Sequence, residues 1–144
     1  MQSGQQIKID QPGLMKVGIP LVIIGFVAGL LWIIGLLGGL VGIVAWVILA
    51  GAGWRYADVA LKDGKQLTLI DAAINGAIIG AVVGVAYGLG QFIGQTISGC
   101  AFFGVRVACA NFFGIFSELF VGAISGGLAA GAWVAYKAGM FKTK

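Results

Sequence analysis

The sequence predicts an all-α protein made of highly hydrophobic, membrane-type helices, arranged as two helical hairpins with about four helices in all. Three observations lead to this fold class. Hydrophobic residues make up 60% of the 144-residue chain and charged residues only 10%, which lies outside the usual range of soluble globular proteins. Residues 17–54 form a run without a single charged side chain. Glycines recur at four-residue spacing in the second half of the chain, a pattern typical of closely packed membrane helices.

The uncharged run sets the size of the first hairpin, which we assign to residues 17–60. As one helix, the run would be about 57 Å long, nearly twice the hydrocarbon core of a bilayer at about 30 Å. Two helices, over about 17–36 and 39–60, would each match that core. The Gly38-Gly39 pair lies between them, and we expect the chain to reverse there.

The prolines predict where the first helix begins. Residues 1–16 form a polar N-terminal arm, and Pro12-Gly13 should break any helix within it. Pro20 would then fall in the first turn of the first helix, where its missing N–H matters least. We therefore expect the arm to precede one hydrophobic helical domain, residues 17–144.

A polar loop, residues 61–71, separates the two hairpins. Asp63-Gly64 is a turn signal within this loop. Thr68 and Asp71 resemble a capping box, with Thr68 as the N-cap of the next helix. The third helix is therefore expected to begin near residue 69.

The second hairpin covers residues 72–138. Its first helix is expected to end near residue 98, and its second helix to extend over about 117–138. The intervening segment, residues 99–116, is rich in aromatic residues, and it could form a turn plus a short helix or the start of the last helix. A basic tail, residues 139–144, closes the chain.

Glycine spacing predicts close helix packing. Residues four apart lie on nearly the same helix face, so such glycines form a groove that another backbone can enter. In water each would weaken a helix by about 1 kcal/mol relative to alanine, so regular spacing indicates a packing role. Packing within one chain and packing between subunits both remain open. The candidate packing residues are Gly25, Gly29, Gly76, Gly80, Gly84, Gly88, Gly122, Gly126, Gly127 and Gly131.

Basic residues gather at one end of the predicted up-and-down arrangement. The positive-inside rule explains this asymmetry, and it is the interpretation that the residues alone favour. The alternative is that this end faces phosphate, either of lipid head groups or of nucleic acid. The basic residues at this end are Lys8, Lys16, Arg55, Lys62, Lys65, Lys137, Lys142 and Lys144.

Arg106 falls outside that group, and Glu118 lies near it in the sequence between apolar runs. A carboxylate at membrane depth is costly and is often functional. A position at the start of a helix, after Ser117, would explain it without a transport role. An ion pair between Arg106 and Glu118 would explain it equally well.

The sequence carries no pattern for catalysis. It has no histidine, no acidic pair at metal-binding spacing and no phosphate-binding loop. Few polar side chains fall within the predicted helices, whereas channels and transporters normally place such groups there. We therefore expect no enzyme activity, no catalytic residue, no metal site and no cofactor. Assembly is the more natural function.

This combination of a short helical chain, glycine-grooved hairpins and a one-sided basic end resembles the highly hydrophobic coat proteins of spindle-shaped archaeal viruses. It is most similar in size and character to the major capsid proteins of the tailed, monocaudavirus-like group. The resemblance covers the overall character of Val17 to Lys137 and not a specific motif. It implies insertion in the host membrane before assembly and residence in the virion afterwards.

The resemblance also implies the partners. Many copies would form a helical or spindle-shaped hydrophobic shell around double-stranded DNA, bound without sequence specificity, and the glycine grooves would serve as subunit contacts. A conjugation-type pilin is the nearest alternative, although such pilins are usually shorter and have one hairpin. A small polytopic membrane protein, such as a holin-like pore, is the third hypothesis.

Overall fold

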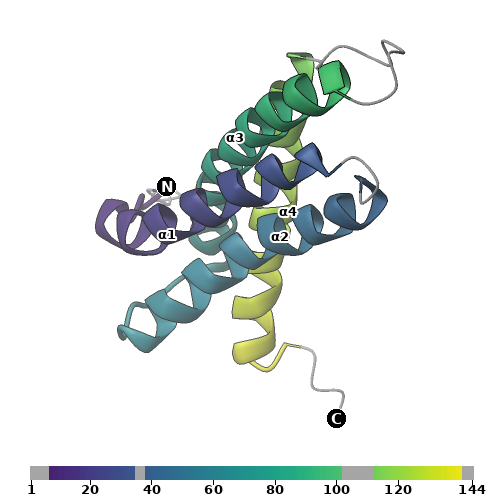
Figure 1. The fold of residues 1–144 in the computed structure, drawn as a ribbon. Coiled ribbons are helices and arrows are strands. Elements are labelled where there is room, and N and C mark those ends of the chain that lie inside the picture. The colour runs from purple at the N-terminus through teal and green to yellow at the C-terminus, as the bar shows by residue number, and fades with distance from the viewer. Residues whose placement is uncertain (1–6, 35–37, 102–111, 141–144) are drawn as a thin grey trace.

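A computed structural model describes residues 7–34, 38–101 and 112–140, and all regular secondary structure in these residues is helical (Figure 1). Consecutive α-helices run in roughly opposite directions, as two hairpins would. The predicted all-α fold class is confirmed. The elements are α1 (Gln11–Leu30), the short 3-10 helix η1 (Leu31–Ile33), α2 (Gly38–Lys62), α3 (Leu69–Ala101) and α4 (Phe113–Lys137).

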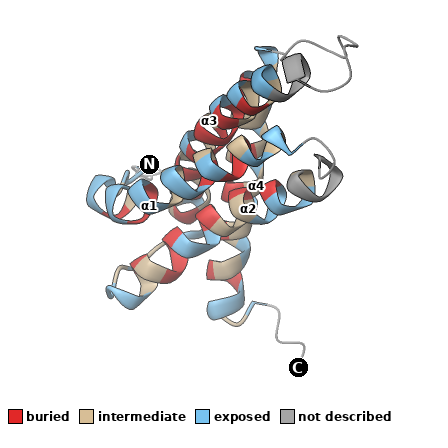
Figure 2. Ribbon diagram, viewed as in Figure 1, coloured by how far each residue is buried: buried red, intermediate tan, exposed pale blue. Residues whose placement is uncertain are grey.

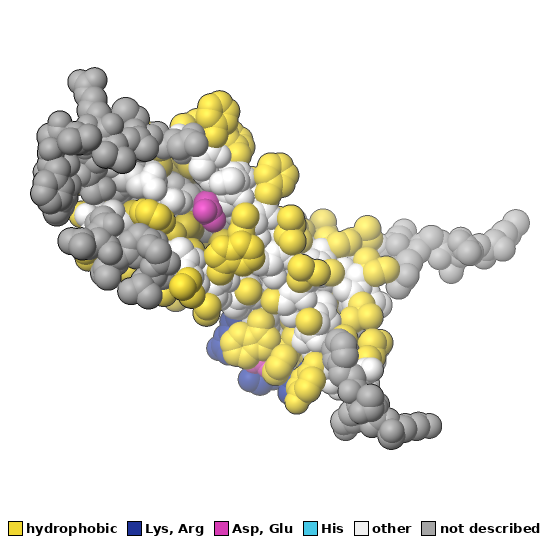
Figure 3. All heavy atoms as spheres, turned by 90° about the vertical axis from the view of Figure 1, so that its right-hand side faces the viewer, with side chains coloured by type: hydrophobic (Ala, Val, Ile, Leu, Met, Phe, Trp, Pro, Cys, Tyr) yellow, Lys and Arg dark blue, Asp and Glu magenta, His cyan; other side chains and the backbone are white. Residues whose placement is uncertain are grey.

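All four α-helices are long and apolar enough to cross a membrane. The candidate spans cover residues 11–33, 42–62, 69–97 and 113–137, and a bilayer core requires about 20 residues. Hydrophobic side chains cover much of the face seen in Figure 3. By length and composition, all four are therefore membrane-type helices, which suggests an association with a membrane.

The first helix begins earlier than the prolines predicted. Asp10 is the N-cap of α1, and its side chain accepts a hydrogen bond from the Gly13 N–H at 3.2 Å. Pro12 falls in the first turn, where the N–H has no helical partner in any case. The expectation that Pro12-Gly13 breaks the helix is therefore wrong, and Pro20 lies inside α1 instead of in its first turn.

The predicted turn between α2 and α3 is confirmed. Gly64 has a φ of +77°, which favours glycine. Its N–H donates to the Leu61 carbonyl at 3.1 Å, and the Lys65 N–H donates to the Ala60 carbonyl at 3.0 Å. These two bonds satisfy carbonyls that the end of a helix leaves without partners.

The last helix also begins earlier than predicted. α4 starts at Phe113, and the Ser117 hydroxyl donates to the Gly114 carbonyl within the helix at 2.8 Å. Ser117 is thus not a cap, and the expectation that Glu118 stands at a helix start is wrong. The Phe112 ring makes edge contacts with Phe92 and Phe116, at 6.0 and 5.9 Å between centroids, and these contacts favour an extra helical turn.

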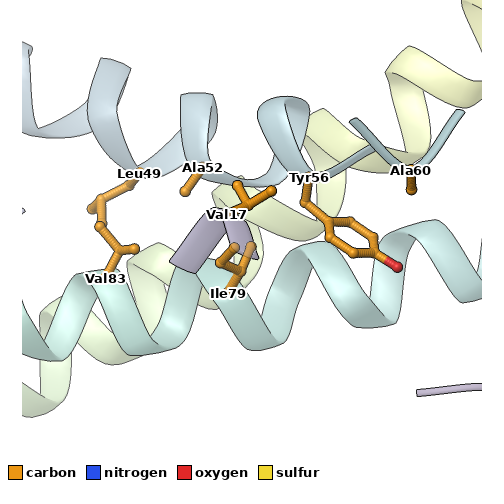
Figure 4. Close-up of a cluster of buried hydrophobic side chains, with 7 residues drawn as sticks. All are labelled: Val17, Leu49, Ala52, Tyr56, Ala60, Ile79 and Val83. Atoms are coloured by element: carbon orange, nitrogen blue, oxygen red, sulfur yellow. The ribbon is translucent and has the colours of Figure 1, made fainter. Parts of the chain in front are cut away.

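The core lies where α1, α2 and α3 meet, and buried residues line the inward faces of the helices (Figure 2). Small side chains alternate with a few large ones (Figure 4), which allows the backbones to approach closely. Two smaller buried clusters, also rich in alanine, extend the core towards both ends. The central cluster consists of Val17, Leu49, Ala52, Tyr56, Ala60, Ile79 and Val83.

Candidate functional site

Glycines of α3 face α4 along the whole contact between these helices, which we name the glycine seam. A Cβ atom at Gly80 would collide with the Gly122 carbonyl oxygen, and one at Gly84 would collide with the Glu118 carbonyl oxygen. A Cβ atom at Gly122 would in turn collide with the Gly80 carbonyl oxygen. No side chain fits at these positions unless the backbones separate.

The other predicted glycines of this helix pair continue the seam. A Cβ atom at Gly76 would collide with Ala130, and one at Gly88 would lie 2.9 Å from the Ile115 Cα. Gly126 faces the Gly76 carbonyl. Two further glycines lie beside Ala73: a Cβ atom at Gly127 would lie 3.0 Å from the Ala73 oxygen, and one at Gly131 would lie 3.7 Å from the Ala73 Cβ.

The predicted glycines of α1 contact α3. A Cβ atom at Gly25 would lie 3.0 Å from the Val83 side chain, and one at Gly29 would collide with the Tyr87 carbonyl oxygen. A glycine of α3 at this contact, Gly90, was not predicted, and a Cβ atom there would collide with the Phe26 carbonyl oxygen. All ten predicted glycines thus lie at contacts between helices of the same chain.

The N-terminal arm is fastened to α3 by Asn75, which is fully buried. The Asn75 side chain accepts a hydrogen bond from the Asp10 N–H at 2.9 Å. It also donates to the carbonyls of Lys8 and Asp71, at 2.9 and 2.8 Å. This role of Asn75 was not predicted, although an amide in the second turn of an apolar helix is a signal that it has a specific partner.

Thr68 and Asp71 form the predicted cap of α3, with a variation. The Asp71 N–H donates to the Thr68 hydroxyl oxygen at 3.1 Å, and that hydroxyl donates to the Asp71 carboxylate at 2.7 Å. In a usual capping box the acidic side chain accepts from the N–H of the cap residue. Here Asp71 accepts from the Lys8 N–H at 3.2 Å, so the cap also holds the arm.

Asp10 connects α1, α2 and the loop after α2 at this end. Its carboxylate accepts from the Lys65 ammonium at 2.6 Å and from the Tyr56 hydroxyl at 3.3 Å, besides capping α1. Burial raises the pKa of Asp10, but the hydrogen bonds from Lys65, Gly13 and Tyr56 and the charge of Lys65 outweigh it. The net pKa lies below the ordinary value of 3.8. We name Asp10, Tyr56, Lys65 and Asn75 the polar lock.

Carboxylates pair with four of the six predicted basic residues that the structure describes at this end. Among the described residues, Lys8 and Lys137 make no ion pair, and Lys142 and Lys144 lie outside the described residues. Each copy therefore presents less free positive charge than the sequence indicates. The ion pairs are Lys16–Asp63 at 3.0 Å, Lys62–Asp58 at 2.8 Å, Arg55–Asp58 at 3.7 Å and Lys65–Asp10 at 2.6 Å.

Glu118 is partly buried in the second turn of α4, with its backbone against Gly84. Arg106 lies outside the described residues, and so does the predicted ion pair between them. Within the described part of the chain, no three His, Cys, Asp or Glu side chains gather as a metal site would require.

Comparisons with protein-family models, with curated proteins and with solved structures found no match to this chain. The function therefore has to be inferred from the chemistry of its own surfaces. The described residues form an interior closed by the glycine seam, a polar end held by the polar lock, and apolar side surfaces.

Proposed function

We propose that this protein is a membrane-inserted structural subunit, of which many copies assemble into a helical or spindle-shaped hydrophobic shell, as in a viral coat around double-stranded DNA. The observation that carries the proposal is the apolar side surface. Val47 on α2 and Leu128 on α4 have exposed fractions of 68% and 70%. In water such a surface would aggregate, so lipid or further copies of the chain must cover it.

The interior favours a structural role over a pore. Alanine, glycine and apolar side chains fill the contacts between the described helices. The buried polar side chains, Asp58 and Asn75, are engaged by Lys62 and by the arm. The described part of a single copy therefore offers no polar path between its helices, and a holin-like function would require a separate arrangement of several copies.

The apolar side surface carries a groove and a ridge of complementary shape. An apolar groove of about 360 Å³ lies between α1 and α3, with Gly18 and Ile79 among its lining residues. On α4, exposed side chains recur every four residues and form a ridge, and helix ridges pack into grooves of about this kind. The ridge consists of Phe116, Phe120, Ile124 and Leu128.

A ridge that enters the groove of the next copy is a head-to-tail contact. Contacts of this type generate rings when the rotation closes and helical assemblies when it does not. This supports a shell or tube over a closed dimer.

The polar end supports the DNA part of the proposal more weakly. One copy has a net charge of only +4, so many copies would have to act together to neutralise DNA.

Negative-stain microscopy of purified material, with and without nuclease, tests the proposal. A coat protein is expected to give tubes or particles whose nucleic acid withstands nuclease. Tubes without nucleic acid would favour a pilin instead. Small oligomers in detergent, together with ion leakage through bilayers on expression, would favour a pore and overturn the proposal.

One variant tests the ridge and groove contact directly. A Cβ atom at Gly18 would lie no closer than 3.8 Å to the Ile79 side chain, so Gly18→Leu should fill the groove and leave the fold intact. We expect this variant to remain folded and to lose assembly. The matched control, Gly51→Leu, adds the same side chain at a glycine whose Cβ would meet nothing within 4 Å. Equal assembly of both variants would exclude the groove as the contact.

A further inference from the structure

Aromatic side chains of α2 and α4 meet near the polar end. The Trp54 ring contacts the Trp133 ring edge-on, with centroids 5.6 Å apart, and Tyr136 stacks on Trp133 at 5.6 Å. Trp54 and Tyr136 remain exposed, at 42% and 61%. Tryptophan and tyrosine are enriched at the level of lipid head groups, where one side of the ring is apolar and the other is wet.

Three cations lie around one carboxylate beside these rings. Asp58 is buried and accepts from Lys62 at 2.8 Å, with Arg55 at 3.7 Å. The Lys137 ammonium lies 4.8 Å from the centre of the Trp133 ring. The cluster therefore keeps an excess of positive charge. Figure 3 shows basic side chains gathered at one place, bordered by hydrophobic ones.

One donor in this cluster lacks an acceptor. The Trp133 Nε1–H is buried and has no hydrogen-bond partner among the described residues. Buried polar groups are nearly always paired, and an unpaired one needs an explanation. The nitrogen has no exposed surface, so a phosphate or ester oxygen of a ligand held by the neighbouring cations would supply the missing acceptor when the Trp133 ring turns outward.

We propose that this cluster, which we name the aromatic-basic patch, binds the phosphate of an anionic phospholipid. Arg55 and Lys137 are the phosphate-binding cations, and Trp133 is the additional donor. The acyl chains follow the outer side of α2. Ile43 and Val47 lie there on the same helix side as Trp54, because residues seven and eleven apart are nearly in line, and both are exposed.

The apolar strip distinguishes a lipid from nucleic acid. A phospholipid places its phosphate beside the cations and its acyl chains along Ile43 and Val47, whereas a DNA backbone would leave that strip uncovered. The proposal requires only the membrane-type helices. It does not depend on assembly into a shell, so each of the two proposals can fail alone.

Native mass spectrometry of the detergent-solubilised protein tests the site with dioctanoyl phosphatidylglycerol and dioctanoyl phosphatidylcholine as probes. We expect the wild-type protein to bind phosphatidylglycerol more tightly. Removing a cation should weaken this binding about fivefold. The double variant Arg55→Gln/Lys137→Gln should therefore lose about 30-fold, and Trp133→Phe should weaken binding while it retains the ring.

Lys8→Gln is the matched control, because Lys8 is exposed and makes no ion pair among the described residues. It lowers the net charge by one, as each of the single substitutions Arg55→Gln and Lys137→Gln does, and it should change phosphatidylglycerol binding by less than about twofold, since a charge outside the patch is largely screened. Equal losses in Lys8→Gln and in the double variant would overturn the proposal. So would equal binding of the two lipids.

Two further measurements on the wild-type protein cover the case of a variant that does not fold. Phosphatidylglycerol binding should weaken as salt is added, whereas phosphatidylcholine binding should not. A short DNA duplex should not displace the bound phosphatidylglycerol. Displacement by DNA, or a lack of salt dependence, would overturn the assignment of an anionic lipid.

Discussion

At the scale of single residues, Asp10 determines how the N-terminal end is built. One carboxylate caps α1 and accepts hydrogen bonds from Lys65 and Tyr56, which are 55 and 46 residues away in the sequence. These contacts favour its charged form. Its folded pKa is therefore lowered, and the stability that it contributes is present above pH 3.8 and is lost as the pH falls through the lower folded value.

Asp10→Asn should retain the cap, because asparagine is also a good N-cap residue. It should lose the pair with Lys65, and we expect the free energy of unfolding to fall by about 1 kcal/mol, since Lys65 is partly exposed to solvent. The decline of the unfolding temperature below pH 4 should become shallower than in the wild-type protein. Thermal melts in detergent between pH 3 and 7 measure both effects. An unchanged pH profile would contradict the role of Asp10.

The hydrogen bonds of Asn75 lead to a separate prediction about the N-terminal arm. Asn75→Leu removes the hydrogen bonds from the Asp10 N–H and to the Lys8 carbonyl, each worth about 1 kcal/mol. We expect trypsin to cut after Lys8 at least about tenfold faster, because the arm leaves α3 more often. Thr96→Val is the control, since among the described residues the Thr96 hydroxyl donates to the Phe92 carbonyl of its own helix and not to the arm. Equal cleavage of both variants would show that Asn75 does not hold the arm.

At the scale of elements, the glycine seam determines which helices pair most closely. Because the Gly80 Cα faces the Gly122 carbonyl, the α3 and α4 backbones are in direct contact. Such contacts replace the hydrophobic effect as the force that joins helices in a lipid environment. The seam therefore holds the second hairpin together within one chain.

Gly80→Ala should separate the two backbones and lower the free energy of unfolding by about 1–3 kcal/mol, the usual effect of overpacking. Gly51→Ala adds the same methyl group where nothing lies within 4 Å, and it should be neutral or slightly stabilising because alanine is the better helix former. Thermal melts of the two variants in the same detergent make the comparison. A destabilisation of Gly51→Ala as large as that of Gly80→Ala would mean that the seam is not tight.

At the scale of the whole molecule, we expect the apolar sides and the charged end to orient the protein in a membrane. The ridge of α4 belongs to the sides, and Met140 lies just beyond the end of that helix. Both are exposed, yet their surroundings should differ. Lipid or another copy would cover the ridge, whereas water or head groups would surround Met140.

This difference predicts opposite results for two lysine substitutions. Leu128→Lys places a charge within a membrane span, which costs about 2.5–3.5 kcal/mol at the centre of a bilayer. We expect the variant to leave the membrane fraction on carbonate extraction. Met140→Lys, outside the spans, should stay in that fraction. If Leu128→Lys is retained as firmly as the wild-type protein, α4 does not cross a bilayer with this side towards lipid.

The sequence by itself determined the apolar helices and the turn at Asp63-Gly64. Helix length and composition are properties of each segment alone, and the left-handed backbone at Gly64 is a local preference. The start of α1 could not be predicted in this way. Pro12-Gly13 predicts a break when it stands alone, and a helix start when Asp10 is held in place by Lys65 and Tyr56.

Only the tertiary structure decided what each glycine and each charge contacts. Four-residue spacing defines a groove on a helix but does not identify the backbone that fills it, and here α4 of the same chain fills the groove of α3. The partners of the cations at the polar end could likewise not be identified from the sequence. Lys16 and Lys65 are paired with carboxylates 47 and 55 residues away, and such distant groups meet only when the helices pack.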